Sequence, residues 1–512
     1  MKRDIDYYRR QLPLFLSLLL FAVLSYYFLR QVGDDGYIYF RYVERALAGH
    51  WWSWSDHMPA VEGYSSPLWY LLLTVSGKLG IAVELASRFW GLLFAFLTLL
   101  GCRELCRVLG LGQMVAGMAC LLLVLNHGFH YWSTAGLETS LYMALLVWAS
   151  IGIIREKHWL LPVALIGVAR PEGPFLLLAI LVAMFIVKRD RMALPWLLAA
   201  LLPMLAWLVL RLAVYGVPLP NTFYAKATGE PLRQLIIGTA YSLPVLLPLL
   251  LVWAVWLRDR LKGTVNQPLM IVAGMCSMLL GIVLLGGGDW MFHFRMLLPL
   301  FALVWAAVLF YWLHNRWLVR CLLIVACLPL LLLSVPPYHL LAAFKGEVLP
   351  EPYYQEGQMT VQSIKLAETI GEAYPDGGLL AVNHAGALPW ALPAFDVIDM
   401  VGLNDAHIAR VEGGIHQKHD ADYVLSLKPD LIVLNSRTKP GTGGIWYHPG
   451  YWQGETALVE HPGFEQYQPL GEPVVWNWRM PRWWWQVPFP YFLILPDDAI
   501  DSWIMVYQRR PQ

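Results

Sequence analysis

The chain has 512 residues, of which 58% are hydrophobic and only 14% are charged. Soluble globular domains carry charges on about a quarter of their residues, so this composition excludes an ordinary soluble protein and, with a mean hydropathy of +0.51, predicts a polytopic α-helical membrane protein. The 37 basic residues nearly balance the 36 acidic ones, which gives no indication of a nucleic-acid partner.

Apolar runs of spanning or near-spanning length fill the first two thirds of the chain. The basic segment 2–10 precedes the first run, so the positive-inside rule places the N-terminus in the cytoplasm. Since no small-residue cleavage site follows this run, we expect a retained signal-anchor helix. The runs cover residues 12–29, 67–82, 88–106, 112–126, 137–153, 159–169, 174–187, 193–214, 236–257, 268–286, 296–313 and 317–336.

One of these runs is not expected to cross the membrane. Only one crossing fits between the outer segment 31–66 and the basic, cytoplasmic Arg103, yet two runs lie there. The run 67–82 is the shorter of the two and contains Lys78, so we assign it to a juxtamembrane or re-entrant helix. Eleven transmembrane helices result, with the C-terminus outside. This topology gathers the polar segments on the outer face: 31–66, 127–138, 215–235 and 286–295.

The character of the chain changes after the last run. Residues 340–512 contain no 18-residue apolar run and are rich in Gly, Pro and Trp. Short apolar segments predict strands at 379–384, 395–399 and 431–435, and these alternate with helical segments near 357–373 and 419–427. We therefore predict a transmembrane domain over 1–336 and an extracytoplasmic soluble α/β domain over 337–512, in a bacterial inner membrane.

No cofactor site is evident in the sequence. The six cysteines all lie in or beside apolar runs, which argues against a disulfide framework and a cysteine metal site. His127 and His130 are spaced as metal ligands on one helix face, but no HExxH or comparable pattern supplies further ligands. A Walker loop and a GxGxxG motif are also absent, which disfavours direct use of a nucleotide.

The segment following the first run carries the adjacent carboxylates Asp34 and Asp35. Holding two carboxylates beside an apolar boundary is costly, and their repulsion raises the pKa of one of them. Such a group is suited to act as a general base or to help bind a metal. The structural alternative is a solvated acidic turn that caps a helix starting near Tyr37.

Further polar segments invite either a functional or a structural interpretation. Ser65 or Ser66 before Pro67 suits a helix start, but this explains Glu62 and Tyr64 less well.

The same choice applies to later loops. Glu138 either caps a helix or binds sugar hydroxyls, and Arg170 with Glu172 forms either a structural ion pair or a phosphate or sugar site. Lys226 and Arg295 are either phosphate ligands or snorkelling interfacial cations. Asp289 with Trp290 resembles a sugar-binding pair, although a Trp is also a common interfacial anchor.

Two successive blocks of the first outer segment resemble the first external loop of GT-C glycosyltransferases. The blocks are Asp-Asp-Gly-Tyr-Ile-Tyr-Phe-Arg-Tyr at 34–42 and Val-Glu-Gly-Tyr-Ser-Ser-Pro-Leu-Trp at 61–69. Within this superfamily, the chain is most similar to the branch of mycobacterial terminal and pseudomonad pilin arabinofuranosyltransferases. Segments in the same order extend the resemblance over most of the chain: 136–140, 169–173, 220–226, 287–295, 385–387 and 399–404.

The resemblance implies inverting transfer of a sugar, by preference D-arabinofuranose, from a polyprenyl-phosphate donor to an extracytoplasmic pilin or cell-surface glycan. It implies Asp34 as the base, with Asp35 as the alternative. A divalent cation, Mg²⁺ or Mn²⁺, is left open. The implied donor-phosphate ligands are Arg41, Arg170, Lys226 and Arg295. The implied sugar or acceptor ligands are Glu62, Tyr64, Glu138, Asn221, Asp289 and Trp290.

Two other functional classes compete with this interpretation. A transporter or flippase of a lipid-linked glycan would use intramembrane Arg170 and Glu172 along a translocation path. Such proteins tend to contain internal repeats with matching broken helices, and no repeat is evident here. A membrane scaffold would require neither an Asp pair nor several convergent cations.

Overall fold

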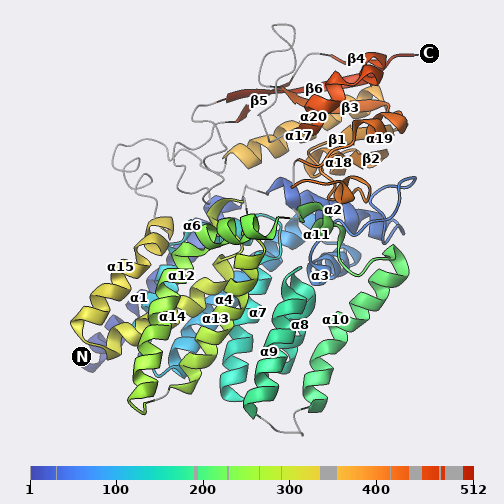
Figure 1. Cartoon of the computed structure of the whole chain (residues 1–512). Coiled ribbons are helices and arrows are strands. Elements are labelled where there is room, and N and C mark those ends of the chain that lie inside the picture. Colours follow the sequence, from blue (N-terminus) through green and yellow to red (C-terminus); the bar gives the residue numbers. More distant parts are fainter. Residues whose placement is uncertain are drawn as a thin grey trace.

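The structure is a computed structural model that describes residues 2–29, 32–188, 194–227, 230–264, 266–289, 291–334, 354–414, 417–436, 453–471, 474–478 and 500–511. It consists of a helical bundle with a smaller α/β domain stacked on one end of it (Figure 1).

Each predicted apolar run contains one helix of the bundle. These helices are α1 (Lys2–Phe28), α3 (Pro67–Lys78), α4 (Val83–Val108), α5 (Gln113–Val124), α7 (Thr139–Arg155), α8 (Leu160–Ala169), α9 (Gly173–Lys188), α10 (Leu194–Tyr215), α12 (Pro231–Leu261), α13 (Gln267–Leu285), α14 (Phe301–His314) and α15 (Trp317–Ser334). The segments between them contain three further helices, which are α2 (Asp34–Leu47), α6 (His127–Thr134) and α11 (Asn221–Lys226). Between α13 and α14 lie the short 3-10 turns η2 (Phe292–Phe294) and η3 (Leu298–Leu300).

The lengths of these helices only partly match the predicted membrane topology. Within the described part of the chain, α4, α10, α12 and α13 are each long and apolar enough to span a bilayer. Helices α5 and α6 make a fifth candidate span if their 65° bend is allowed. The apolar helices α7, α8 and α9, together with residues 298–314 and 317–331, are shorter. Several apolar helices are thus observed, while the count of eleven crossings and their orientation stay predictions.

The C-terminal domain contains a six-stranded mixed sheet flanked by helices. Its strands are β1 (Gly378–Val382), β2 (Phe395–Asp399), β3 (Leu431–Ser436), β4 (Tyr467–Pro469), β5 (Val474–Trp478) and β6 (Ile500–Arg509). Its helices are α17 (Tyr354–Ala373), α18 (Ala387–Trp390), α19 (Ala421–Ser426) and α20 (Gln453–Glu460), with 3-10 turns η4 (Ile408–Arg410) and η5 (Pro462–Gln466).

The sheet order is β2-β1-β3-β6-β4, and β5 also pairs with β6. Strands β2, β1 and β3 are parallel, with Val382 opposite both Asp399 and Val433, whereas β4, β5 and β6 add an antiparallel half. The three predicted strands and the two predicted helices are therefore confirmed. The antiparallel half was not predicted from the sequence.

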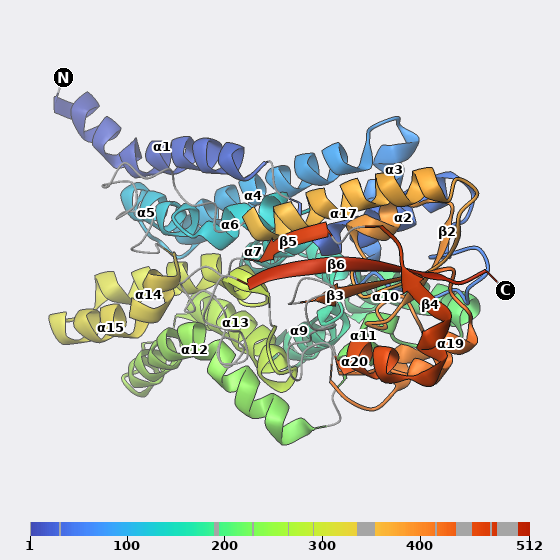
Figure 2. The same ribbon diagram turned by 90° about the horizontal axis from the view of Figure 1, so that it is seen from above.

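Alternation along the strands gives the sheet two apolar faces. Leu380 and Val382 of β1 belong to the same buried apolar cluster as the bundle core, whereas Ala381 packs in a second cluster with Ile398 and Leu458 of α20. Seen from above, the described part of the domain lies over α2, α10 and α11, while α1, α14 and α15 lie outside its outline (Figure 2). The domain thus covers the end of the bundle where the polar segments gather.

Candidate functional site

Asp34 and Asp35 occupy the first turn of α2, where successive side chains point about 100° apart. Asp34 faces the C-terminal domain, and its Oδ1 accepts a hydrogen bond from the Ala387 amide at 2.8 Å. Gly386 permits this approach, since a Cβ there would lie 2.5 Å from Asp34 Oδ1. Burial outweighs these backbone hydrogen bonds and raises the pKa of Asp34 to about 7.

Asp35 faces a different environment, a group of charges contributed by three other loops. Burial raises the pKa of its carboxyl, and the nearby cations Arg295 and Lys226 oppose this shift. The carboxylates of Asp289 and Glu138 are also close enough to raise it further. Asp35 is half-buried, so it retains contact with solvent. The two adjacent carboxylates therefore differ in what they face.

Asp289 and Arg295 form a buried ion pair across the turn between α13 and α14. Arg295 Nε lies 2.9 Å from Asp289 Oδ2, and the Met291 amide donates weakly to Oδ1 at 3.4 Å. Although burial opposes it, the charges of Arg295 and Lys226 hold the pKa of Asp289 below its ordinary value.

Lys226 ends α11 and lies beside this pair. Its amine interacts electrostatically with Arg295, Asp289 and Asp35, and burial lowers its pKa. Its side chain nevertheless remains exposed. Among the described residues no direct ion-pair partner of the amine is recorded, which leaves it suited to bind an anion from solution.

A chain of buried charges extends from this group toward the bundle. Arg170 lies at the break between α8 and α9, with Nη1 at 3.3 Å from Glu138 Oε1 and Nε donating to Glu172 Oε1 at 2.6 Å. The Tyr39 hydroxyl donates to the other oxygen of Glu138 at 3.3 Å. Glu138 and Arg170, which were both predicted as site residues, are therefore in contact, and Glu172 also pairs with Arg170.

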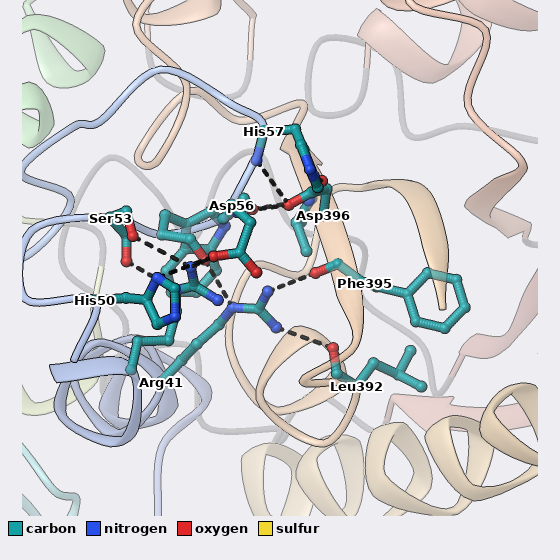
Figure 3. A network of polar contacts seen from close by, with 12 residues as sticks. Arg41, His50, Ser53, Asp56, His57, Leu392, Phe395 and Asp396 are labelled. Carbon is teal, nitrogen blue, oxygen red and sulfur yellow. Dashed lines mark hydrogen bonds and ion pairs between the residues drawn. The ribbon is translucent and has the colours of Figure 1, made fainter. Parts of the chain in front are cut away.

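The structure places Arg41 away from any free anion site. Nε donates to the Trp54 carbonyl at 3.1 Å, and the two Nη groups donate to the carbonyls of Pro389, Leu392 and Phe395 (Figure 3). The guanidinium also lies over the Trp54 ring at 4.9 Å. Because its donors are occupied, Arg41 joins α2 to the C-terminal domain, and this geometry does not support the predicted phosphate contact.

The contact between α2 and the C-terminal domain also includes a network of polar side chains at the surface, contributed by α2 and the loop after it. His57 Nδ1 lies 2.6 Å from Asp396 Oδ2, and the Asp56 amide donates to Asp396 Oδ1 at 2.7 Å (Figure 3). Asp56 in turn pairs with Arg45 at 2.5 Å and His50 at 3.2 Å. Loop and domain are thus held together by several contacts around Arg41.

Glu62 also has a structural partner that the sequence did not suggest. Its carboxylate accepts from Arg211 Nε and, at 3.1 Å, from Arg211 Nη2, while the Trp207 indole donates to it at 2.9 Å. Glu62 is only 1% exposed. These contacts occupy the carboxylate and tie the loop to α10, which argues against the predicted sugar contact. The one detectable signal was a charge, Arg211, inside an apolar run.

Two further predicted sugar ligands are engaged by other parts of the protein. Tyr64 is buried within the bundle, where its ring stacks on that of Tyr70 in α3 with centroids 4.5 Å apart. Asn221 Nδ2 donates to the carbonyls of Gly402, Leu403 and Asp405 at 2.9 to 3.1 Å. Asn221 therefore joins α11 to the C-terminal domain. Trp290, the remaining predicted ligand, lies outside the described residues.

Two tyrosines of α2 fix the loop that carries Glu62 and Tyr64. The Tyr42 hydroxyl donates to the Val61 carbonyl at 2.8 Å and accepts from the Gly63 amide at 3.1 Å. Tyr39, one turn earlier, accepts from the Ser66 amide at 2.9 Å. The tyrosine spacing of the first block thus explains its fixed relation to the second block.

The described residues contain no group of three His, Cys, Asp or Glu side chains arranged to hold a metal ion. Cations at the site come instead from Lys226, Arg170 and Arg295. His130 of the His127–His130 pair is engaged by Ser25 at 3.0 Å and by the Val124 carbonyl at 2.7 Å.

Comparisons with known proteins indicate the fold. A family model described as a domain of unknown function (DUF8728) matches residues 351–483. No curated protein matches the sequence at a significant level. The chain is similar in structure to ArnT from Cupriavidus metallidurans bound to undecaprenyl phosphate, with a TM-score of 0.54, 13% identity, and 96% and 97% of the two chains covered. The apo state of the same protein gives a TM-score of 0.47 at 12% identity over the same shares. The first comparison shows that the chain shares its overall fold with ArnT.

Proposed function

We propose that the protein is a membrane glycosyltransferase that transfers a sugar from a polyprenyl-phosphate donor to an extracytoplasmic acceptor. The observation that carries this proposal is the convergence of Asp35 with Lys226, Arg295 and Asp289 beneath the C-terminal domain. It brings together a carboxylate of raised pKa and two cations, one of them exposed, which are the groups that this reaction needs.

The transfer requires one base and a site for the leaving group. An acceptor hydroxyl oxygen attacks the anomeric carbon and loses its proton to the base, while the bond from that carbon to the phosphate oxygen breaks. The bonding electrons leave with the polyprenyl phosphate. Its negative charge is stabilised by Lys226 and Arg295, while the base holds the proton until it passes to water. Attack opposite the departing phosphate inverts the anomeric centre.

Within the Asp pair, the geometry favours Asp35 as the base over Asp34. The Asp34 carboxylate is hydrogen-bonded to the backbone of the C-terminal domain, whereas Asp35 lies with the cations that suit the leaving phosphate. Burial raises the pKa of both carboxyls, which suits either as a proton acceptor, so the contacts rather than the pKa separate them. We therefore assign Asp35 as the base and Asp34 as a docking residue.

The lipid class is supported by the shared fold. ArnT, which has this architecture, binds undecaprenyl phosphate. An exposed Lys226 beside Arg295 gives the present chain a site of matching charge for such a phosphate. Arg170 lies one contact further, through Glu138. Arg170 and Glu138 are 4% and 1% exposed and pair with each other, so we propose that they support the site from the bundle side rather than contact the donor.

The identity of the sugar and acceptor rests on the motifs of the sequence. We propose D-arabinofuranose as the sugar and a pilin or a cell-surface glycan as the acceptor, outside a bacterial inner membrane with the N-terminus in the cytoplasm. The cluster at Lys226 supports transfer without a resident metal, because protein cations are available for the phosphate; dependence on Mg²⁺ or Mn²⁺ is tested by adding a chelator.

The test uses the full chain reconstituted in vesicles. Polyprenyl-phosphoryl D-arabinofuranose and a polyprenyl-phosphoryl hexose are supplied with purified pilin or surface polysaccharide, and the mass of the acceptor and the release of polyprenyl phosphate are measured. We expect a pentose adduct that Lys226→Met reduces by at least tenfold. Lys78→Met, which removes an exposed amine lying over Trp51, is the matched control and keeps activity.

Each outcome is decisive for one function. An adduct lost in Lys226→Met but kept in Lys78→Met supports the transferase. Movement of the lipid-linked sugar across the vesicle without a covalent product overturns it in favour of a flippase. A hexose adduct would support the reaction and overturn the choice of sugar.

A further inference from the structure

The turn that carries Arg295 is held in an unfavourable backbone conformation. His293 and Phe294 both adopt left-handed angles, with φ of +58° and +52°. Residues with a Cβ rarely take this conformation, because the Cβ crowds the following carbonyl. Two in succession persist only where the surroundings determine the backbone. Arg295 follows directly, so whatever holds this turn also sets the direction of the guanidinium.

Helix α6 holds the turn from one side. Gly128 lets α6 approach closely, since a Cβ there would lie 2.6 Å from the Cβ of His293. The ring of Tyr131 lies 5.7 Å from that of His293. Helix α6 thus supports the first of the two left-handed residues.

Tyr241 of α12 holds the turn from the other side. Its ring lies 5.1 Å from that of Phe294, and its hydroxyl accepts from the Met296 amide at 3.2 Å. Gly288 packs against the same ring, where a Cβ would lie 2.5 Å from Tyr241 Cγ. The second left-handed residue is therefore fixed as firmly as the first, and the turn is clamped between two helices.

Trp132, also on α6, contacts Arg295 itself. The guanidinium carbon lies 5.3 Å from the centroid of the indole, which is buried at 1% exposure. An aromatic face at this distance attracts a cation, most strongly where water is excluded. Because Arg295 Nε also donates a hydrogen bond to Asp289, the Trp132 ring and the Asp289 carboxylate together restrict the plane of the guanidinium. Among the described residues, the polar contact of the Arg295 guanidinium is made by Nε, to Asp289. Because Asp289 and the Trp132 ring fix the plane of the guanidinium, they also fix the direction in which its two Nη groups point.

We propose that Trp132, supported by the clamped turn, is a positioning residue that orients Arg295 to bind the phosphate of the polyprenyl donor. This rests on the proposed function. It gives α6 a role in the anion site in place of the metal site considered for the His127–Trp132 segment. An oriented guanidinium offers two parallel N–H groups to a phosphate, whereas a mobile one must be ordered on binding.

The experiment measures equilibrium binding of undecaprenyl phosphate to the full chain in detergent micelles. Trp132→Leu removes the aromatic face and Trp132→Phe keeps it. Trp256→Leu is the matched control, because Arg260 lies over the Trp256 ring at a similar 5.4 Å but on the far end of α12. We expect Trp132→Leu to raise Kd about three- to tenfold. Trp132→Phe restores most of the affinity, and Trp256→Leu leaves it unchanged.

The outcomes separate this inference from the proposed function. Wild-type protein that fails to bind undecaprenyl phosphate overturns both. Wild-type binding with an unchanged Kd in Trp132→Leu overturns the inference alone, as does an equal loss in Trp132→Leu and Trp256→Leu, which would indicate a general loss of folding. An equal loss in Trp132→Leu and Trp132→Phe would show that the aromatic face is not what orients Arg295.

Discussion

The Asp34 carboxylate accepts a hydrogen bond from the Ala387 amide at 2.8 Å, although 353 positions separate the two residues in the chain. Two turns further along α2, Arg41 binds the carbonyls at the other end of the same short helix, α18. An anion at the N-terminus of a helix and a cation at its C-terminus both match the direction of the helix dipole. Helix α2 thus contacts α18 at both of its ends, and the second carboxylate of the Asp pair, Asp35, faces the cations.

These different roles of Asp34 and Asp35 predict that two conservative substitutions have very different effects on the rate of transfer. Asp35→Asn removes the proton acceptor, so we expect transfer to fall by about 10² to 10⁴-fold with no change in thermal unfolding. Asp34→Asn keeps a carbonyl oxygen that can accept from Ala387, so activity should stay within about tenfold of wild type. Initial rates with the lipid donor decide between them; the reverse order of effects would return the base to Asp34.

The close approach of α18 to α2 predicts a strong effect at Gly386. A methyl group there would meet the Asp34 carboxylate at 2.5 Å, so Gly386→Ala should lower the free energy of unfolding by about 1 to 3 kcal/mol and loosen the domain. Gly371→Ala in α17 is the control, since its Cβ would meet only Leu392 at 3.9 Å and should be neutral or slightly stabilising. Limited proteolysis and thermal unfolding measure both; equal stability of the two variants would refute the contact.

How much of this arrangement was predictable differs between the fold and the site. Hydrophobic periodicity and length are local properties, so the twelve apolar helices and the three parallel strands were found from sequence. The pairing of β6 with both β4 and β5 was not, because it joins segments distant in the chain. The number of membrane crossings depends on helix tilt and partial insertion, which composition alone does not determine.

Within the site, sequence identified the charged residues but not their partners. Asp35, Lys226, Asp289 and Arg295 were selected and do lie together. Arg41 was expected to bind the donor phosphate because it lies near the Asp pair in the sequence. A helix presents different faces at different positions, and only the tertiary contact with α18 reveals that Arg41 points elsewhere.

Glu62 was also selected from the sequence, but its carboxylate binds Arg211 and Trp207 instead of a sugar site. This contact can be tested. With the partly buried Arg211 as its partner, Glu62→Gln removes one charge of the pair and leaves the other partly desolvated, so it should cost about 2 to 4 kcal/mol of stability. Glu230→Gln, which breaks an exposed pair with Arg233, should change stability by less than about 1 kcal/mol. Thermal unfolding tests this. A raised KM for the donor with unchanged stability in Glu62→Gln would instead indicate a sugar ligand.

The rate of transfer should rise with pH. Burial raises the pKa of Asp35, so at acidic pH the carboxyl is protonated and unable to accept the acceptor's proton. As pH increases through this raised pKa, the base ionises and kcat increases toward a plateau. A pH–rate profile with saturating donor measures this. A profile that is flat through the acidic range would contradict a carboxylate base.

Stability of the C-terminal domain should change in the opposite direction, and Glu455 provides the test. Its buried carboxyl accepts hydrogen bonds from Asn383 and Asn435, yet burial dominates and raises its pKa from 4.5 to about 8. A group with a raised folded-state pKa contributes its full stabilisation below its unfolded value and loses it as pH rises through the folded value. Asp399, raised to about 6, acts in the same direction.

Between pH 4.5 and 8, Glu455 should therefore lower the free energy of unfolding by up to about 1.4 kcal/mol for each pH unit. Glu455→Gln carries no titrating proton, so it should flatten this slope, whereas Glu460→Gln, exposed on the same helix α20, should leave it intact. Hydrogen exchange of the β3 amides, corrected for intrinsic rates, reports the slope in the full chain. The buried His384 of the same domain has its pKa lowered to about 4 and so contributes the opposite slope below about pH 6.5, which makes pH 6.5 to 8 the decisive window. An equal slope in the wild type and in Glu455→Gln over this window would contradict the raised pKa of Glu455.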